Sequence, residues 1–180
     1  ADYRAYNNLG ELAYQAGKFD EAESYFKTAL QKNASAAEAN ANLGLISLIK
    51  GDKAAAETYL GKAAGAAGLN EAFGNYYIAA GQYDRAVTSF GDVKTNSAAL
   101  AQILTKDYNR AKSTLEGVKN PDAYTAYLSA ILGARTNNAA MVISNLKTAV
   151  SKDASLAKKA ATDLEFAKYV TNSEFQSIVK

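Results

Sequence analysis

The small and apolar positions of this chain follow a repeat. Two glycines seven residues apart occur three times, as Gly10 with Gly17, Gly44 with Gly51 and Gly74 with Gly81. The step from the second pair to the third is slightly shorter than the first step. Five residues after the second glycine stands an alanine, and four residues later a large apolar residue: Ala22 and Phe26, Ala56 and Leu60, Ala86 and Phe90. A period of about 34 residues with this pattern predicts a stack of antiparallel helix pairs.

Each position of the repeat has a physical reason. The first glycine lies inside the first helix of a pair, helix A, where a side chain would block the approach of the second, helix B. The second glycine ends helix A, where a left-handed residue costs little only for glycine or asparagine. Asp20 and Asp84 follow in the turns, and we expect their carboxylates to cap helix B. The alanine lets the two helices cross closely, and the large apolar residue fills the core.

These residues resemble the tetratricopeptide repeat (TPR). Residues 3–35 are similar to a near-complete repeat, with Tyr6 where the family usually has tryptophan. Residues 37–66 and 67–91 resemble two further repeats, through the glycines, alanines and large apolar residues described above. The resemblance implies an all-α, right-handed superhelix, that is, an α-α solenoid of about five antiparallel helix pairs.

Two degenerate units follow, at residues 92–120 and 121–150. In the first, Lys106 replaces the second glycine and helix A is short, over about residues 96–104. In the second, Pro121 is expected at the first helical position, where its missing amide is harmless. Asn137 is expected to take the left-handed conformation that glycine has elsewhere. We expect regular superhelical geometry to be lost around residues 92–120.

The last segment, residues 151–180, differs from the repeats and is expected to cap the stack, because a terminal repeat otherwise exposes an apolar face. Thr162 with Glu165, and Thr171 with Glu174, have the spacing of capping boxes. Four apolar residues would pack on the preceding pair: Phe166, Tyr169, Phe175 and Ile178. Residues 151–180, which we call the closing segment, resemble the carboxyl-terminal segment of bacterial TPR proteins. We expect one domain over residues 1–180, within a longer chain.

The amino-acid composition excludes several kinds of catalytic and metal-binding site. The 180 residues include no histidine and no cysteine, so imidazole bases, thiolate nucleophiles and cysteine zinc sites are excluded. Twenty basic residues against 18 acidic ones give a net charge of +2, and Lys158 with Lys159 is the only adjacent basic pair. Nucleic-acid binding, which needs a concentrated basic surface, is not expected. Nor is a transmembrane segment, a metal or a cofactor. The 38 alanines favour helix.

The family resemblance implies a partner-binding surface on the concave side, lined by helix A. Carried onto this chain, the family positions include Asn7, Glu11, Tyr14, Leu45, Leu48, Ile49, Asn75, Ile78, Tyr124, Tyr127 and Arg135. This surface begins polar and becomes apolar. These residues form either an open groove that binds a peptide or helix or a set of side chains packed between neighbouring helices. Of the residues that grip a terminal carboxylate in chaperone-binding TPR proteins, only Asn42 is matched, so such a clamp is not expected.

The resulting hypothesis is a non-catalytic scaffold or adaptor that binds a protein or peptide partner. The alternative is a glycan-binding or small-molecule-binding protein of the bacterial envelope, with Tyr124, Tyr127 and Arg135 as its candidates. Gly61-Lys62 with Gly65 and Gly68 resembles a phosphate loop but lacks the required spacing. An enzyme using carboxylates alone would need two acids facing one cleft, which the repeat positions do not supply. The periplasm or cell envelope is favoured over the cytoplasm.

Overall fold

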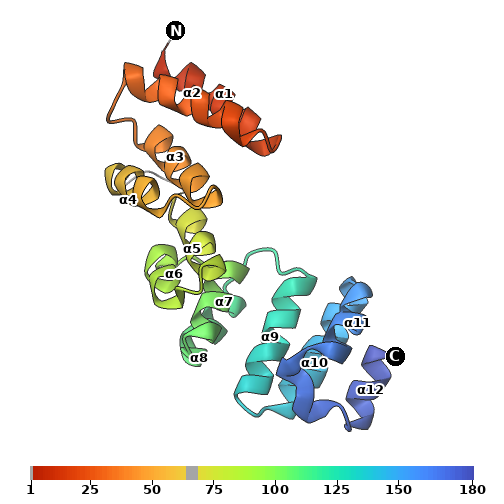
Figure 1. Cartoon of the computed structure of the whole chain (residues 1–180). Coiled ribbons are helices and arrows are strands. Elements are labelled where there is room, and N and C mark those ends of the chain that lie inside the picture. The colour runs from red at the N-terminus through yellow and green to blue at the C-terminus, as the bar shows by residue number, and fades with distance from the viewer. Residues whose placement is uncertain (1, 64–68) are drawn as a thin grey trace. The chain divides into compact units, whose positions relative to one another are not determined.

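The computed structural model describes residues 2–63 and 69–180 of the chain, and every regular element in these ranges is a helix (Figure 1). The all-α prediction is therefore confirmed. The chain divides into two compact units, unit 1 over Ala1–Ala79 and unit 2 over Ala80–Lys180. The predicted junction between the second and third repeats, at residues 66 and 67, lies outside the described residues, as do Gly65 and Gly68.

The described residues of unit 1 form five helices. They are α1 (Tyr3–Gln15), α2 (Phe19–Lys32), α3 (Ala37–Ile49), α4 (Lys53–Lys62) and α5 (Leu69–Ala79). The helices α1 and α2 pack as a pair, as do α3 and α4, and α2 also packs against α3. This is the solenoid order that the repeat predicted, in which each helix B covers the next helix A.

Unit 2 contains two helix pairs, a preceding helix and the carboxyl-terminal segment. Its elements are α6 (Tyr83–Phe90), α7 (Asn96–Leu104), α8 (Tyr108–Glu116), α9 (Ala123–Arg135), α10 (Ala139–Lys152), α11 (Ser155–Thr162), the 3-10 helix η1 (Leu164–Tyr169) and α12 (Ser173–Val179). The pairs are α7 with α8 and α9 with α10, and α11 and α12 lie against α10 (Figure 1). The short helix A predicted over 96–104 is α7.

Close helix approach explains the first glycine of the first two repeats. A methyl group built on Gly10 would lie 2.5 Å from the Phe26 ring, and one on Gly44 would overlap the Leu60 side chain. Any larger residue at either site would therefore push helix B away from helix A.

The left-handed turns after helix A also follow the prediction. Gly17 has φ 74°, and Lys106 and Asn137 take the same region with φ 64° and 55°. Both residues stand where the degenerate units lack the glycine, so the turn geometry is retained although the residue that favours it is lost.

Several predicted helix starts are wrong by one or two residues. Helices α2 and α6 begin at Phe19 and Tyr83, so Asp20 and Asp84 lie inside the first turn and cap nothing. Their charges still face the positive end of the helix dipole. Pro121 precedes the cap of α9, and that cap is Asp122, whose carboxylate accepts the Thr125 amide at 2.8 Å.

The two predicted capping boxes of the last segment are also replaced. Thr162 ends α11, and the next residue, Asp163, caps η1 by accepting the Glu165 amide at 3.0 Å. Asn172 caps α12 in place of Thr171, accepting the Phe175 amide at 3.0 Å. In both cases a carboxylate or amide oxygen one residue further along the chain takes the position assigned to a threonine hydroxyl. The cap preference ranks aspartate and asparagine above threonine.

Candidate partner-binding surface

Eight of the predicted binding residues lie in unit 1, on its three helices A. They are Asn7, Glu11 and Tyr14 on α1, Leu45, Leu48 and Ile49 on α3, and Asn75 and Ile78 on α5. Helix α3 packs against both α1 and α5, so the three helices form one continuous row. We call these eight residues together with Asn42 the helix-A face.

One end of the helix-A face is a hydrogen-bonded polar cluster. The buried Asn7 side chain donates from Nδ2 to Glu11 Oε1 at 2.9 Å, and Asn42 Nδ2 donates to Asn7 Oδ1 at 3.3 Å and to Glu11 Oε1 at 3.4 Å. The exposed Glu11 carboxylate is thus oriented by amides from two repeats. Asn42, the single residue shared with a carboxylate clamp, already faces a carboxylate of the chain itself.

The other end of the helix-A face is apolar and partly open. Ile49, at the end of α3, is 50% exposed, while Leu45, Leu48 and Ile78 are half-buried. Tyr14 is also half-buried, with its ring edge-on to Phe19 at 5.6 Å between centroids. These side chains are neither fully packed core nor fully solvated, which leaves apolar area available to a partner.

Charge is unevenly divided between the two kinds of helix in unit 1. The described helices A carry three exposed carboxylates, Glu11, Glu38 and Glu71, against one cation, Arg4. Lys50 follows α3, but its ammonium pairs with Asp20 at 2.6 Å and with Glu23 on α2. These hydrogen bonds raise the pKa of Lys50. The helix-A side of unit 1 is therefore acidic.

The remaining predicted binding residues, Tyr124, Tyr127 and Arg135, lie on α9 and contact the closing segment. Tyr127 is only 1% exposed, and its hydroxyl donates to Asp163 Oδ2 at 2.7 Å. Burial, reinforced by this hydrogen bond to a carboxylate, raises the pKa of Tyr127. Its ring meets Phe166 edge-on, with centroids 5.6 Å apart. The prediction that Tyr127 contacts a partner is therefore wrong, because the closing segment covers it.

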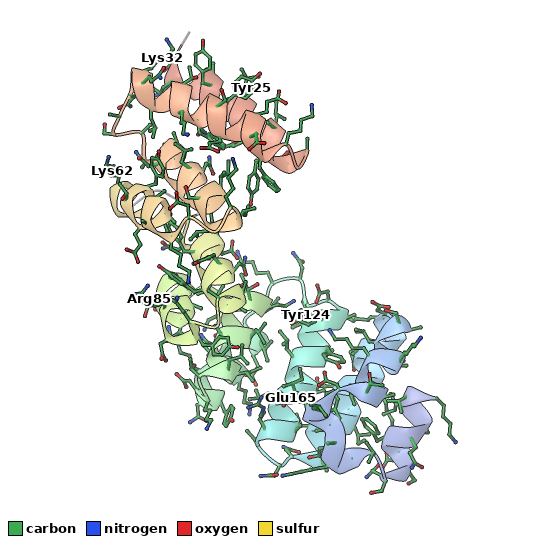
Figure 2. The ribbon with its side chains drawn as sticks, in the orientation of Figure 1. Tyr25, Lys32, Lys62, Arg85, Tyr124 and Glu165 are labelled. Atoms are coloured by element: carbon green, nitrogen blue, oxygen red, sulfur yellow. The ribbon has the colours of Figure 1, made fainter. Side chains whose placement is uncertain are left out.

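Arg135 and Tyr124 are similarly engaged by the closing segment. Arg135 forms a two-pronged ion pair with Glu165 of η1, at 2.6 and 2.5 Å. The Lys159 ammonium lies 5.1 Å from the Tyr127 ring centroid and 5.7 Å from that of Tyr124, which remains partly exposed. Tyr124 of α9 and Glu165 of η1 are labelled in Figure 2. Of the three side chains expected to form a glycan site, Tyr127 is buried, whereas Tyr124 and Arg135 remain partly exposed. They hold residues 155–169 against α9.

The sequence-based reasoning missed the anchoring acids of the closing segment. The sequence predicted only a local capping role for Glu165 and no role for Asp163. In the structure each bonds a side chain of α9, Asp163 to Tyr127 and Glu165 to Arg135. The spacing of these residues could have indicated the contacts. Tyr127 and Asp163 are 36 residues apart, and Arg135 and Glu165 are 30 apart, which is close to one repeat length. A residue one repeat downstream is a neighbour in a solenoid.

Within residues 2–63 and 69–180, no group of three or more acidic side chains is arranged to hold a metal ion. No helix described there is long and apolar enough to cross a membrane.

Comparisons with known proteins agree with this geometry. A tetratricopeptide repeat family matches residues 3–70. Among solved structures, the chain is similar to YrrB, a TPR protein with an unusual peptide-binding site, with a TM-score of 0.62 and 21% identity, covering 86% of this chain and 90% of that one. It is also similar to a tetratricopeptide repeat protein from Parabacteroides merdae, with a TM-score of 0.58 and 16% identity, covering 99% of this chain and 72% of that one. No curated protein sequence matches it. Residues 3–70 therefore match the tetratricopeptide repeat family, and the chain has a helical-repeat fold like that of these two TPR proteins.

Proposed function

We propose that this chain is a non-catalytic interaction scaffold that binds a peptide or helix of a partner protein on the helix-A face of unit 1. The observation that carries the proposal is Ile49, which is 50% exposed beside the half-buried Leu48 of the same helix, in a row that continues to Ile78. Apolar anchors that are partly open in the free protein are what a peptide-binding surface needs. The similar fold of YrrB, a TPR protein with a peptide-binding site, supports the same kind of activity.

The polar cluster indicates which partner charge is preferred. A carboxylate approaching Asn42 would meet the Glu11 carboxylate, which accepts hydrogen bonds from two asparagines, and like charges at contact repel. Glu38 and Glu71 add further negative charge on the same helices. We infer that the bound segment carries a lysine or arginine near the polar end and an apolar side chain near Ile49.

A randomised peptide-display selection on the intact chain tests this function. The expected result is enrichment of peptides that combine an apolar residue with a lysine or arginine, and loss of their binding by Ile49→Asp. Glu11→Gln keeps an acceptor for Asn42 but removes the charge, so it should abolish the basic preference and retain apolar binding.

Leu164→Asp is the matched control, because Leu164 is 89% exposed on unit 2 and the change introduces the same charge far from the helix-A face in sequence. Circular dichroism checks that each variant keeps its helix content. The proposal fails if the selected peptides bind Ile49→Asp and wild type equally, or if acidic peptides are enriched.

A further inference from the structure

Unit 2 contains a groove that is separate from the helix-A face. It encloses about 440 Å³ between α8, α9, α10 and the connection of residues 117–122, which is a volume typical of small-molecule pockets. Three of its apolar lining residues are buried, with Leu115 7% exposed, Ala126 8% and Leu132 2%. The groove therefore offers a largely apolar interior within one compact unit.

The equivalent space in unit 1 is filled by side chains. The left-handed residues that follow each helix A align the two interfaces, Gly17 with Lys106 and Gly51 with Asn137. In this alignment Leu115 corresponds to Phe26, and Ser129 corresponds to Leu43. Phe26 and Leu43 are fully buried and pack in one cluster of the α2–α3 interface. Because leucine and serine are smaller, the α8–α9 interface lacks an aromatic ring and an aliphatic side chain that the regular repeat supplies.

The groove also exists because α8 ends early. Helix α2 has 14 residues, whereas α8 has nine and ends at Glu116. Val118 corresponds to Ala29, which is fully buried in α2, yet Val118 lies in the connection beyond α8 and is only half-buried. The connection continues to Pro121, which has no amide hydrogen with which to extend a helix. The opening is thus built into the fold of the degenerate unit.

Two oxygen atoms that line the groove remain able to accept hydrogen bonds. The Ser129 hydroxyl donates to the Thr125 carbonyl at 3.0 Å, which leaves the lone pairs of its own oxygen available. Asn145 Nδ2 donates to the Met141 carbonyl at 2.9 Å, while Asn145 Oδ1 accepts no hydrogen bond from the described residues. Ser129 and Asn145 are both half-buried, on the paired helices α9 and α10. A ligand with a hydrogen-bond donor would therefore be oriented in this groove.

The charged residues of the groove balance one another. Two are basic and two are acidic: Lys112, Lys152, Glu116 and Asp122. Lys152 Nζ already donates to the Pro121 carbonyl at 2.9 Å, and the Asp122 carboxylate caps α9. An ionic ligand would gain no net attraction and would lose hydration over the apolar interior. The groove thus favours an uncharged ligand.

We propose that this groove is a binding site for an uncharged aromatic molecule that carries a hydrogen-bond donor, such as an indole or a phenol. The aromatic ring occupies the space that corresponds to the Phe26 ring in unit 1, against Leu115 and Leu132. The N–H or O–H group donates to Ser129, which stands where the regular repeat has Leu43. Apolar cavities that arise from a missing side chain bind aromatic molecules of matching size.

Indole is a suitable probe, because the chain contains no tryptophan and indole can be excited beyond the absorption of tyrosine. Titration with the intact protein should give a saturable blue shift of the indole emission, and the amide NMR signals of residues around the groove should move. The analogue 1-methylindole lacks the donor and should bind about fivefold more weakly, which corresponds to one hydrogen bond of about 1 kcal/mol. Ser129→Ala should reduce this preference for indole.

Filling the groove tests the location. Ser129→Leu restores the side chain that the regular repeat has at this position and should weaken indole binding tenfold or more. Ser144→Leu is the matched control, because Ser144 is exposed on α10 and does not line the groove, so it should leave binding unchanged. Circular dichroism checks the helix content of each variant.

A second filled variant combines Leu115→Phe with Ala99→Gly. Ala99 corresponds to Gly10, and the glycine makes room for the new ring as Gly10 does for Phe26. This variant should also lose indole binding. The proposal is overturned if indole emission does not shift with wild type, if the amide signals that move lie outside the groove, or if a filled variant with intact helix content binds indole as tightly as wild type.

Discussion

Replacing Tyr127 by phenylalanine tests directly whether this side chain is structural. The substitution keeps the ring that packs on Phe166 and removes only the hydroxyl that donates to Asp163 at 2.7 Å. A hydrogen bond to a charged group contributes about 1.5–3 kcal/mol. Asp163 is half-buried, so water partly replaces the lost donor. We therefore expect the free energy of unfolding of unit 2 to fall by about 1.5 kcal/mol, the lower end of that range.

Equilibrium urea unfolding measures this loss, and a double-mutant cycle assigns it to the pair. Asp163→Asn is the suitable second change, because asparagine retains the capping oxygen that accepts the Glu165 amide. The coupling between the two changes should be about 1 kcal/mol or more.

Tyr124→Phe is the matched control on the same helix. Its hydroxyl has no hydrogen bond to the described residues and its side chain is partly exposed, so the change should alter stability by less than about 0.5 kcal/mol. If Tyr127→Phe were as mild as Tyr124→Phe, the hydroxyl would not be anchoring the closing segment, and the reassignment of Tyr127 from binding to structure would be wrong.

Three further changes probe other parts of the fold. Gly10→Ala should lower the free energy of unfolding by about 1–3 kcal/mol in urea, because the new methyl group overlaps the Phe26 ring. Gly61→Ala is the control and should not destabilise the fold, because its methyl group meets no atom within 4 Å. Equal losses of stability in the two variants would contradict the close approach of the helices at Gly10. Lys106→Gly should raise the unfolding free energy by about 0.5–1 kcal/mol, since φ 64° strains a side chain and not glycine; a loss would refute the strain. Hydrogen bonds from two lysines lower the pKa of the Glu23 carboxyl. The stability that this carboxylate contributes is therefore full above the ordinary carboxyl pKa and disappears as the pH falls through the lowered value. Glu23→Gln should lower the thermal midpoint at pH 7, and the difference from wild type should vanish in acid; a difference that stays constant with pH would exclude the ion pair.

The repeat could be predicted from the sequence because the interactions that define it are local. Gly10 lies under Phe26 in its own helix pair, and Lys106 and Asn137 adopt a conformation that depends on their place in a turn. Interactions that span a few residues, or one helix pair of known geometry, leave a pattern in the residue order. The short helix α7 was predictable for the same reason, since the distance between successive alanines limits its length.

The caps were less predictable because several neighbouring residues compete for one position. Asp20 was expected to cap α2, yet the helix begins at Phe19. Thr162 was expected to open a helix, yet Asp163 caps the next one. Which oxygen reaches a free amide depends on where packing starts the helix, and a shift of one residue changes the donor and the acceptor.

The sequence by itself determined the helical pairs, their order and the positions where they touch, because these follow from the spacing of small and apolar residues. Only the tertiary structure decided which of two equivalent side chains is available to a partner. Leu9 and Leu43 occupy the same repeat position, and one is 42% exposed while the other is 1% exposed. Tyr127 likewise matches a binding position and is covered by Phe166. Exposure depends on whether a neighbouring helix covers the residue, and that is a property of the assembled stack.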